Sequence, residues 1–312
     1  MKPAIITTLI VLLLGGIGVM AARSPLRLRT SDTLQSAPST QVIARKTNDV
    51  NYRGVSFAFD PSLAPDVKSE TIPASTEGKP SDIWPEHPGF TLRGSPRSRA
   101  QSEKDPQIRV FPLREFRDAV GVASKKGNEG VQNPPDWTTY FDEEVNVLKL
   151  LLAAKPPQMN LGRFLASARG TPGCSAEMPF LPMWEACMAV VGHVRYVSFK
   201  NGKGVFFLTQ WDRETSQVTN GGLEYAFQGI TDDGKYWVYA EFSVAVPFLP
   251  EGEEPDVVAW NEKNYLLPHR SREYQNYLRP ILTKLEALPA SKFHPNLELL
   301  EQLIQSLEVQ SK

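Results

Sequence analysis

Two glycine-containing dipeptides, each between apolar alternating segments, constrain the fold of this chain more than any other feature. Asn201-Gly202 separates VVGHVRYVSFK from GVFFLTQW, and Asp233-Gly234 separates GLEYAFQGIT from KYWVYAEFSVAV. Such dipeptides suit the positive φ angles of the tight turns that join neighbouring antiparallel strands. Two hairpins in succession predict a four-stranded antiparallel meander over about residues 190–246.

Short extended segments precede this meander, and helices follow it. Alternating apolar residues predict earlier strands at 54–60, 71–74, 90–94 and 107–113. Apolar stripes at helical spacing predict helices at 140–154, 271–288 and 296–309, and Pro280 is expected to kink the second of these. Residues 161–184 have no clear period and are predicted to be irregular. Strands first and helices later, without βαβ alternation, predict an α+β fold: an antiparallel sheet packed by C-terminal helices.

The first segment of the chain predicts export. Lys2 precedes an uncharged run, Pro3–Ala22, in which Val19 and Ala21 form a small-x-small cleavage pattern. Residues 1–22 are therefore predicted to be a signal peptide. The alternative is an uncleaved anchor, since about 20 apolar residues can span a bilayer, and the protein would contact the membrane only in that case. Either way, we expect the remainder to be extracytoplasmic, in the periplasm or secreted.

The rest of the chain is predicted to be a tether followed by one domain. Residues 23–53 contain mostly small and polar side chains, which cannot offset their ordering entropy by burial, so a disordered polar tether is expected. Residues 54–312 are predicted to form a single α+β domain. A chain of 312 residues is long enough for one large domain with appendages.

Cys174 and Cys187 are the only cysteines of the chain. In an oxidising compartment, an even number of cysteines favours a disulfide, which here would close a short loop and contribute about 3 kcal/mol. The alternative is two separate buried thiols. There is no CxxC motif, so no metal site is predicted from this pair.

Charge and motifs exclude several classes of function. The 34 Lys and Arg residues balance 35 Asp and Glu residues, and a net charge of −1 gives no field that attracts nucleic acid. Neither GxGxxG nor GxxxxGK[ST] is present, so no nucleotide cofactor is predicted, and no other cofactor is indicated. The familiar zinc, serine and cysteine hydrolase motifs are also missing.

Several segments resemble a family of uncharacterised exported bacterial proteins. They are GVSFAFDPSLA (54–64), PEHPGFTL (85–92), PQIRVFP (106–112), NGKGVFFLTQ (201–210), FQGITDDGKY (227–236) and the closing NLELLEQLIQSLEV. The resemblance covers most of the chain from Arg53 to Val309 and implies an exported, sometimes lipid-anchored domain with no assigned activity. Lipid attachment does not carry over, because the first cysteine is Cys174, and the cysteine pair departs from the family pattern.

The predicted hairpin registers place polar residues on sheet faces. If Asn201-Gly202 is a two-residue turn, Arg195 pairs with Leu208 and His193 with Gln210, so that His193, Arg195 and Gln210 share a face. In the second hairpin, Gln228 pairs with Tyr239, Ala226 with Glu241 and Glu224 with Ser243. Glu224, Gln228, Tyr239 and Glu241 therefore share a face, and the opposite face of this hairpin is apolar and belongs to the core.

If the polar faces of the two hairpins coincide, they form a candidate site. Its candidate catalytic residues are His193, Glu224 and Glu241, because two carboxylates near a histidine can transfer protons or hold a divalent cation. The candidate binding residues are Arg195, Gln210, Gln228 and Tyr239. The alternative is a solvated sheet face with cross-strand charge pairs. The other histidines, His87, His269 and His294, adjoin prolines and are expected at the surface or in turns.

Aromatic residues suggest a second kind of site. Amphipathic aromatic side chains often line carbohydrate or peptide grooves. The tryptophans that could do so here are Trp84, Trp137, Trp184, Trp211, Trp237 and Trp260.

These observations favour a non-enzymatic exported protein that binds a component of the cell envelope or a partner protein. The alternatives are a hydrolase-like enzyme that uses the Glu/His cluster, and a structural accessory subunit. If the carboxylates of Glu224 and Glu241 were more than about 10 Å apart, the hydrolase hypothesis would be wrong, because paired glycosidase carboxylates lie closer together than that.

Overall fold

The computed structural model describes residues 47–96, 105–127, 136–169, 178–182, 186–269 and 271–310. The chain divides into two units, residues 1–44 and 45–312, and every described residue belongs to the second unit. The predicted signal peptide (1–22), most of the predicted tether and Cys174 lie outside the described residues. None of the helices in the described ranges is long and apolar enough to cross a membrane.

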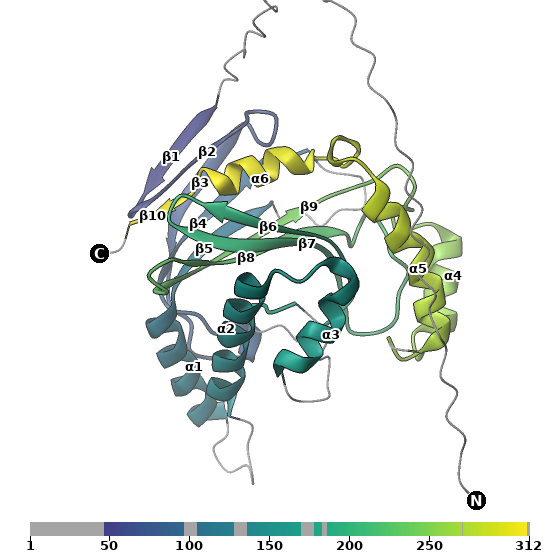
Figure 1. Ribbon diagram of the computed structural model, residues 1–312, viewed down its shortest axis with the longest axis horizontal. Helices are drawn as coiled ribbons and strands as arrows, with labels where there is room; N and C mark the ends of the chain where they lie inside the picture. The colour runs from purple at the N-terminus through teal and green to yellow at the C-terminus, as the bar shows by residue number, and fades with distance from the viewer. Residues whose placement is uncertain are drawn as a thin grey trace, which may run out of the picture. The chain divides into compact units, whose positions relative to one another are not determined.

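A seven-stranded antiparallel sheet forms the centre of the second unit (Figure 1). Its strand order is β3-β4-β5-β9-β8-β7-β6. The strands are β3 (Asp66–Ile72), β4 (His87–Arg93), β5 (Gln107–Pro112), β6 (Cys187–Phe199), β7 (Gly202–Asp212), β8 (Glu224–Thr231) and β9 (Tyr236–Ser243). The last four strands are neighbours in chain order, as the hairpin dipeptides predict. The α+β fold is confirmed.

A three-stranded sheet with the order β1-β2-β10 lies against the main sheet. Its strands are β1 (Asn48–Tyr52), β2 (Val55–Phe59) and β10 (Glu308–Val309). Strand β1 corrects the predicted tether, which was expected to extend to residue 53. The reason is local burial: the Tyr52 ring packs 6.3 Å from the Phe90 ring, and its hydroxyl lies 2.8 Å from Oγ1 of Thr71.

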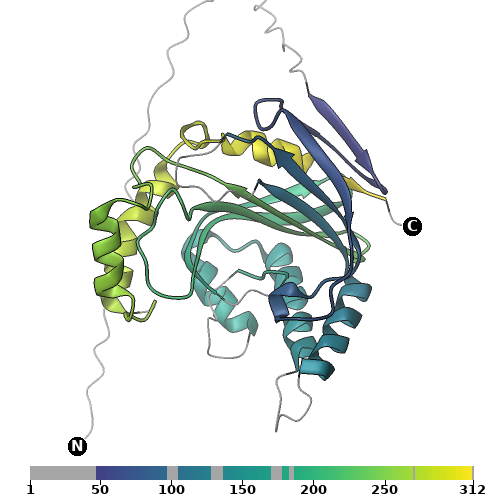
Figure 2. The same ribbon diagram turned by 180° about the vertical axis from the view of Figure 1, so that it is seen from behind.

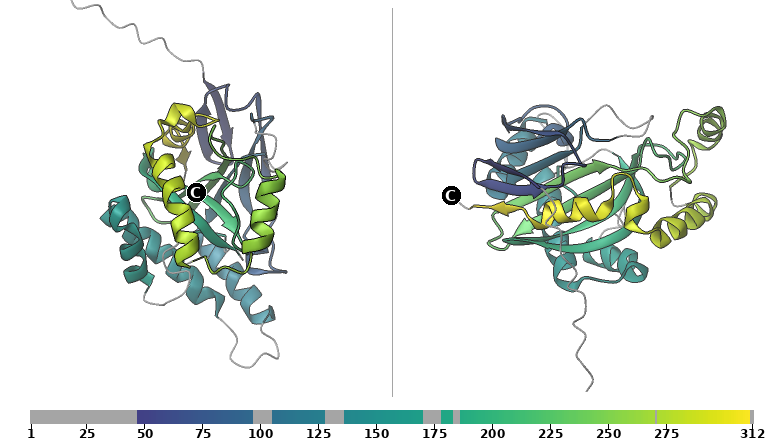
Figure 3. Two further views of the ribbon diagram at one scale, coloured as in Figure 1. Left: turned by 90° about the vertical axis from the view of Figure 1, so that its right-hand side faces the viewer. Right: turned by 90° about the horizontal axis from the view of Figure 1, so that it is seen from above.

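Helices cover both faces of the main sheet, as Figures 1 and 2 show. One face packs against α1 (Leu113–Gly127), α2 (Trp137–Ala154) and α3 (Gln158–Arg169), and we call it the α2 side. The other face packs against α5 (Arg272–Ala287), α6 (Leu297–Gln305) and the small sheet, and we call it the α6 side. Helix α4 (Pro255–Asn264) lies beside α5 at one end of the sheet (Figure 3). Two short 3-10 helices are η1 (Pro80–Asp82) and η2 (Ala290–Lys292).

Three of the six helices agree with the sequence prediction, except that the third ends at Gln305 instead of residue 309, because Glu308 and Val309 pair with β2 as strand β10. They are α2, α5 and α6, and Pro280 lies inside α5. Helices α1, α3 and α4 were not predicted, and α3 occupies part of the stretch that was expected to be irregular. The buried residues Leu113, Phe116 and Val120 of α1, and Leu161 and Leu165 of α3, recur at helical spacing, so both stripes were present in the sequence but were missed. Helix α4 buries only Val257 and has no such stripe.

The alternation of side chains along each strand divides the core into two clusters. Phe206, Tyr225 and Phe227 belong to the cluster on the α6 side. Val205 and Trp237 belong to the cluster on the α2 side. The apolar face predicted for the second hairpin is therefore confirmed as core. Its other face is not simply solvated, because α1–α3 cover part of it.

The turn of the first hairpin differs from the prediction. Phe199 pairs with Gly202, so Lys200 and Asn201 form the two-residue loop. A Cβ atom on Gly202 would lie 2.1 Å from Cζ of Phe199 and 2.6 Å from the carbonyl oxygen of Ile230. Gly202 is therefore needed for the close packing of a ring and a neighbouring strand rather than for the turn.

This shift, together with two irregularities in β6, changes the predicted pairs of the first hairpin. Arg195 pairs with Phe206 instead of Leu208, and Gln210 pairs with Val190 instead of His193. The register of the second hairpin agrees with the prediction: Gln228 pairs with Tyr239, Ala226 with Glu241 and Glu224 with Ser243.

Candidate functional site

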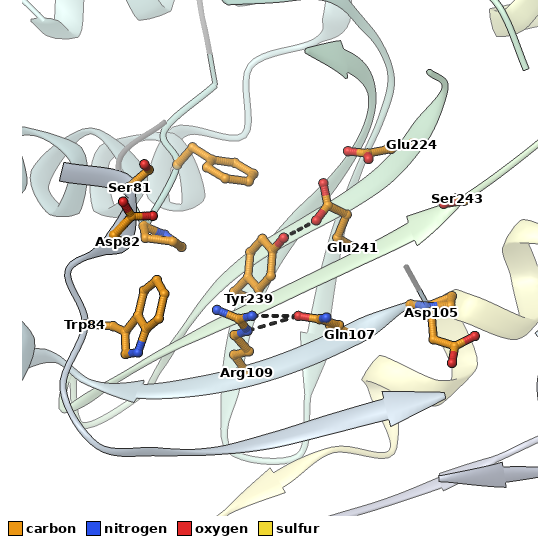
Figure 4. Close-up of a pocket in the computed structure, with 13 residues that line it drawn as sticks. Ser81, Asp82, Trp84, Asp105, Gln107, Arg109, Glu224, Tyr239, Glu241 and Ser243 are labelled. Atoms are coloured by element: carbon orange, nitrogen blue, oxygen red, sulfur yellow. Dashed lines mark hydrogen bonds between the residues drawn. The ribbon is translucent and has the colours of Figure 1, made fainter. Parts of the chain in front are cut away.

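A polar cleft of about 330 Å³ opens on the α2 side of the main sheet (Figure 4). Strands β5, β8 and β9 form its floor, the segment around η1 forms one wall, and residues 178–182 form another. Its lining residues are Ser81, Asp82, Trp84, Asp105, Pro106, Gln107, Arg109, Phe180, Pro182, Glu224, Tyr239, Glu241 and Ser243. Three of the predicted candidates, Glu224, Tyr239 and Glu241, are among them.

The strand register explains why the floor is polar. Arg109 of β5 pairs with Tyr239 of β9, and Gln107 pairs with Glu241. Residues that are paired across antiparallel strands point to the same side, so all four side chains face the cleft. Arg109 and Glu241 are consequently diagonal neighbours on adjacent strands.

The Arg109 guanidinium is held by neutral groups. Its Nε and Nη2 donate to Oε1 of Gln107 at 3.1 and 2.7 Å. Its central carbon lies 5.5 Å from the centroid of the Trp84 ring, a distance at which a cation is attracted to the aromatic face. The Trp84 ring is fixed in turn, because its Nε1 donates to the carbonyl oxygen of Pro73 at 3.1 Å. Arg109 forms no ion pair with any carboxylate in the described part of the chain.

Glu241 is also held by a neutral group. The hydroxyl of Tyr239 donates to Oε2 of Glu241, as the dashed line in Figure 4 shows. Burial, followed by the negative charges of Glu241 and Glu224, raises the pKa of Tyr239 well above its usual value. The phenol therefore stays protonated at neutral pH and donates to the carboxylate. Among the residues that the structure describes, no Lys or Arg lies within ion-pair distance of Glu241.

Helices α2 and α3 position the wall of the cleft at Phe180. The backbone N–H of Phe180 donates to Oε2 of Glu144 at 2.8 Å, and the Glu144 carboxylate forms a buried ion pair with Arg169. The Phe180 ring packs edge-on against Tyr239, with centroids 5.6 Å apart. One residue further along, the N–H of Leu181 donates to the side chain of Gln228.

The predicted candidates do not all meet at this cleft. Gln228 is on the same side but fully buried, and its Oε1 accepts hydrogen bonds from Leu181 N–H and from Nε1 of Trp237. His193 is on the α6 side, where its ring packs 6.2 Å from Tyr225 and 5.5 Å from Phe293. Because Tyr225 and Glu224 are consecutive in β8, they point to opposite faces, and His193 is separated from Glu224 by the sheet. The predicted cluster of His193 with Glu224 and Glu241 is therefore wrong.

Arg195 and Gln210 are on the α6 side as well. Arg195 is exposed and pairs with Phe206, a core residue of that side. The side chain of Gln210 has a structural role, because its Nε2 donates to Asp212, Ser216 and the carbonyl oxygen of Gln217. These contacts hold the loop that follows β7. Neither residue contributes to the cleft.

His87 differs from the surface position that was expected for it. It begins β4 and is 1% exposed, and its Nδ1 donates to the carbonyl oxygen of Pro85 at 2.7 Å. Burial lowers its pKa to about 4, against the opposing effect of that hydrogen bond, and Arg109 lowers it further. His294 is exposed, as expected, and His269 is half-buried.

Of the tryptophans, Trp84 lines the cleft, whereas Trp237 is fully buried in the core and Trp184 lies outside the described residues. Within the described ranges, no three His, Cys, Asp or Glu side chains are grouped to hold a metal ion. Cys187 begins β6 and its predicted partner Cys174 is not described, so the disulfide stays a prediction.

Gln107, Arg109 and Asp82 were not predicted as site residues from the sequence. In the segment QIRVFP, Gln107 and Arg109 alternate with Ile108 and Val110, which indicates that the two polar side chains share one face of a strand. They reach the cleft only because β5 pairs with β9, more than a hundred residues away, and no local pattern specifies that pairing.

No protein-family model matches this chain, and the searches of the curated proteins and of the solved structures also gave no match. The resemblance to exported bacterial proteins therefore stays a prediction.

Proposed function

We propose that this protein is an exported, non-enzymatic binding protein of the cell envelope, and that the cleft on the α2 side is its ligand site. The observation that carries the proposal is that both Arg109 and Glu241 face the cleft, and that each is oriented by neutral neighbours. Charged groups that are fixed before a ligand arrives lose little conformational entropy on binding. A volume of about 330 Å³ suits a small molecule.

The envelope location is supported by the first segment of the chain and by the family resemblance. The apolar run Pro3–Ala22 with its small-x-small pattern has the features of an export signal. An envelope component or a partner protein would then be the source of the ligand.

A hydrolase-like enzyme is the second candidate, and one observation favours it. Ala226 pairs with Glu241 and Glu224 pairs with Ser243, so Glu224 and Glu241 are diagonal neighbours in one cleft. The Cα atoms of diagonal neighbours are about 7–8 Å apart. Side chains that start from this backbone spacing and face the same cleft can bring their carboxylates to the separation of about 5–9.5 Å that paired catalytic carboxylates have, although the pair acts without His193.

The test combines binding with product analysis. Mature protein purified from the producing cell is mixed with sugars, amino acids and dicarboxylates, and its Tm and the chemical state of each compound are measured. We expect at least one compound to raise Tm in the wild type but not in Glu241→Gln or Arg109→Gln, and to be recovered unchanged. Conversion of a compound by the wild type but not by Glu241→Gln would establish the hydrolase instead. If no compound raises Tm, the proposal is wrong.

A further inference from the structure

The cleft holds two opposite charges that do not pair with each other. Arg109 and Glu241 occupy diagonal positions on β5 and β9, where side chains of opposite charge are close enough to interact. Each bonds instead to a neutral residue two positions away on its own strand: Arg109 to Gln107, and Glu241 to Tyr239 (Figure 4). Nη1 of Arg109 and Oε1 of Glu241 consequently have no hydrogen-bond partner among the described residues.

From this arrangement we propose that the cleft binds a small zwitterion with neighbouring ammonium and carboxylate groups, such as an α-amino acid or a short peptide. The inference rests on the proposed function and specifies its ligand. The carboxylate of the ligand accepts from Nη1 of Arg109, and its ammonium group donates to Oε1 of Glu241. Both bonds are charge-assisted, which makes them stronger than bonds between neutral groups.

Other classes of ligand fit these charges less well. A simple anion would pair with Arg109 but leave Glu241 without an opposite charge, and a simple cation would pair with Glu241 but leave Arg109 without one. A neutral sugar would displace water from both charges without supplying the opposite charge, and a desolvated, unpaired charge is costly. A zwitterion compensates both charges in one binding event.

The cleft fixes the direction in which a zwitterion would bind. Trp84 and Gln107 hold the guanidinium at one point of the floor, and Tyr239 holds the carboxylate of Glu241 at another. The side chain of the ligand would then contact the aromatic wall at Phe180.

The test measures the affinity of the full mature protein for alanine and leucine, in both configurations, and for alanylalanine. Each compound is compared with its N-acetyl derivative, which has no cation, and with its C-terminal amide, which has no anion. Isothermal titration calorimetry gives the affinities. We expect each derivative to bind at least about tenfold more weakly than the free zwitterion in the wild type.

Two variants assign each ligand group to its protein partner. In Arg109→Gln the free acid and the amide should bind equally, whereas the effect of N-acetylation should persist. In Glu241→Gln the amine and its N-acetyl form should bind equally, whereas the effect of amidation should persist. The matched controls, Arg114→Gln and Glu115→Gln on the exposed part of α1, should retain both differences. Should Arg109→Gln fail to fold, Arg109→Lys keeps the charge and should bind more weakly, because it lacks the planar fork.

The outcomes separate the two proposals. If a sugar or a dicarboxylate raises Tm through the cleft but no amino acid or peptide binds, the zwitterion inference is wrong and the proposed function stands. If zwitterions bind with affinities that neither Arg109→Gln nor Glu241→Gln changes, this cleft is not their site and the inference is also wrong. If no compound of any class binds, both proposals are overturned.

Discussion

At the scale of single residues, the buried His87 makes folding sensitive to acid. Its folded-state pKa of about 4 is below the ordinary value of 6.5, so the unfolded chain binds this proton more tightly than the folded chain does. The contribution of neutral His87 to stability is therefore complete above pH 6.5 and is lost as the pH falls to 4. This difference in pKa between the unfolded and the folded state corresponds to about 3 kcal/mol in the free energy of unfolding.

We therefore predict that His87→Phe has a free energy of unfolding that varies less between pH 4 and 6.5 than that of the wild type. Phenylalanine keeps an aromatic ring beside Phe111, which lies 4.3 Å from the His87 ring, but it cannot take up a proton. Urea unfolding at several pH values measures the difference. The matched control is His294→Asn at an exposed histidine, which should keep the pH dependence of the wild type. Parallel pH profiles for His87→Phe and wild type would contradict the prediction.

The site residues that could be predicted from the sequence are those whose placement depends on one short hairpin. Glu224, Tyr239 and Glu241 follow from the Asp233-Gly234 turn and the two-residue period of strands, and all three line the cleft. His193 could not be placed in this way. It has a φ of 50° at an irregularity of β6, where the register with β7 shifts between Gly192 and Arg195, so the regular pairing assumed from the turn does not hold for His193.

At the scale of secondary-structure elements, one ion pair connects α2, α3 and the wall of the cleft. Glu144 is fully buried and Arg169 almost so, and the carboxylate also accepts the N–H of Phe180. Removing one member of such a pair leaves an uncompensated buried charge. We predict that Glu144→Ala lowers the free energy of unfolding by about 3–5 kcal/mol and weakens ligand binding, because Phe180 loses its anchor.

Two further variants test this explanation by urea unfolding. The double variant Glu144→Met/Arg169→Met should recover most of the lost stability, because two apolar side chains of similar size leave no charge unpaired. Arg117→Gln removes an exposed ion pair with Asp142 between α1 and α2, and should lower the free energy of unfolding much less than Glu144→Ala does, because solvent screens exposed charges. A loss of similar size in Arg117→Gln and Glu144→Ala would show that burial does not determine the strength of these pairs.

Elements were predictable where a local period was sufficient. Helices α2, α5 and α6 each present an apolar stripe, whereas α4 buries only Val257 and has no stripe to detect. Gly202 shows the same limit for a turn. The Asn-Gly dipeptide predicts that this glycine lies in the turn, whereas in the structure it is needed because the Phe199 ring and the backbone of Ile230 pack against it. Information about packing between distant segments is not contained in short windows of sequence.

At the scale of the whole molecule, the order of elements along the chain was sufficient to predict the α+β class and the neighbouring strands β6–β9, but it was not sufficient to predict the complete strand order of the sheet. The sheet places β5 beside β9, and β10 beside β2, although each pair is far apart in the chain. Asn201 shows how such a distant pairing is stabilised, since its side chain exchanges hydrogen bonds with the backbone of Val309. The cleft exists only because β5 pairs with β9, so its complete set of residues required the tertiary structure.

The export of the protein and the oxidation of its two cysteines are predicted together, because a disulfide forms in an oxidising compartment outside the cytoplasm. If residues 1–22 direct export, protein recovered from the producing cell begins near Ala22, and Cys174 and Cys187 are oxidised to a disulfide. N-terminal sequencing and thiol titration after denaturation should find a processed start and no thiol. Reduction should then lower the free energy of unfolding by about 3 kcal/mol in the wild type and leave Cys174→Ser/Cys187→Ser unchanged, because only the wild type has a closed loop to open. Recovery of soluble protein that starts at Met1 and has two titratable thiols would contradict export and the disulfide together, and with them the envelope as the source of the ligand.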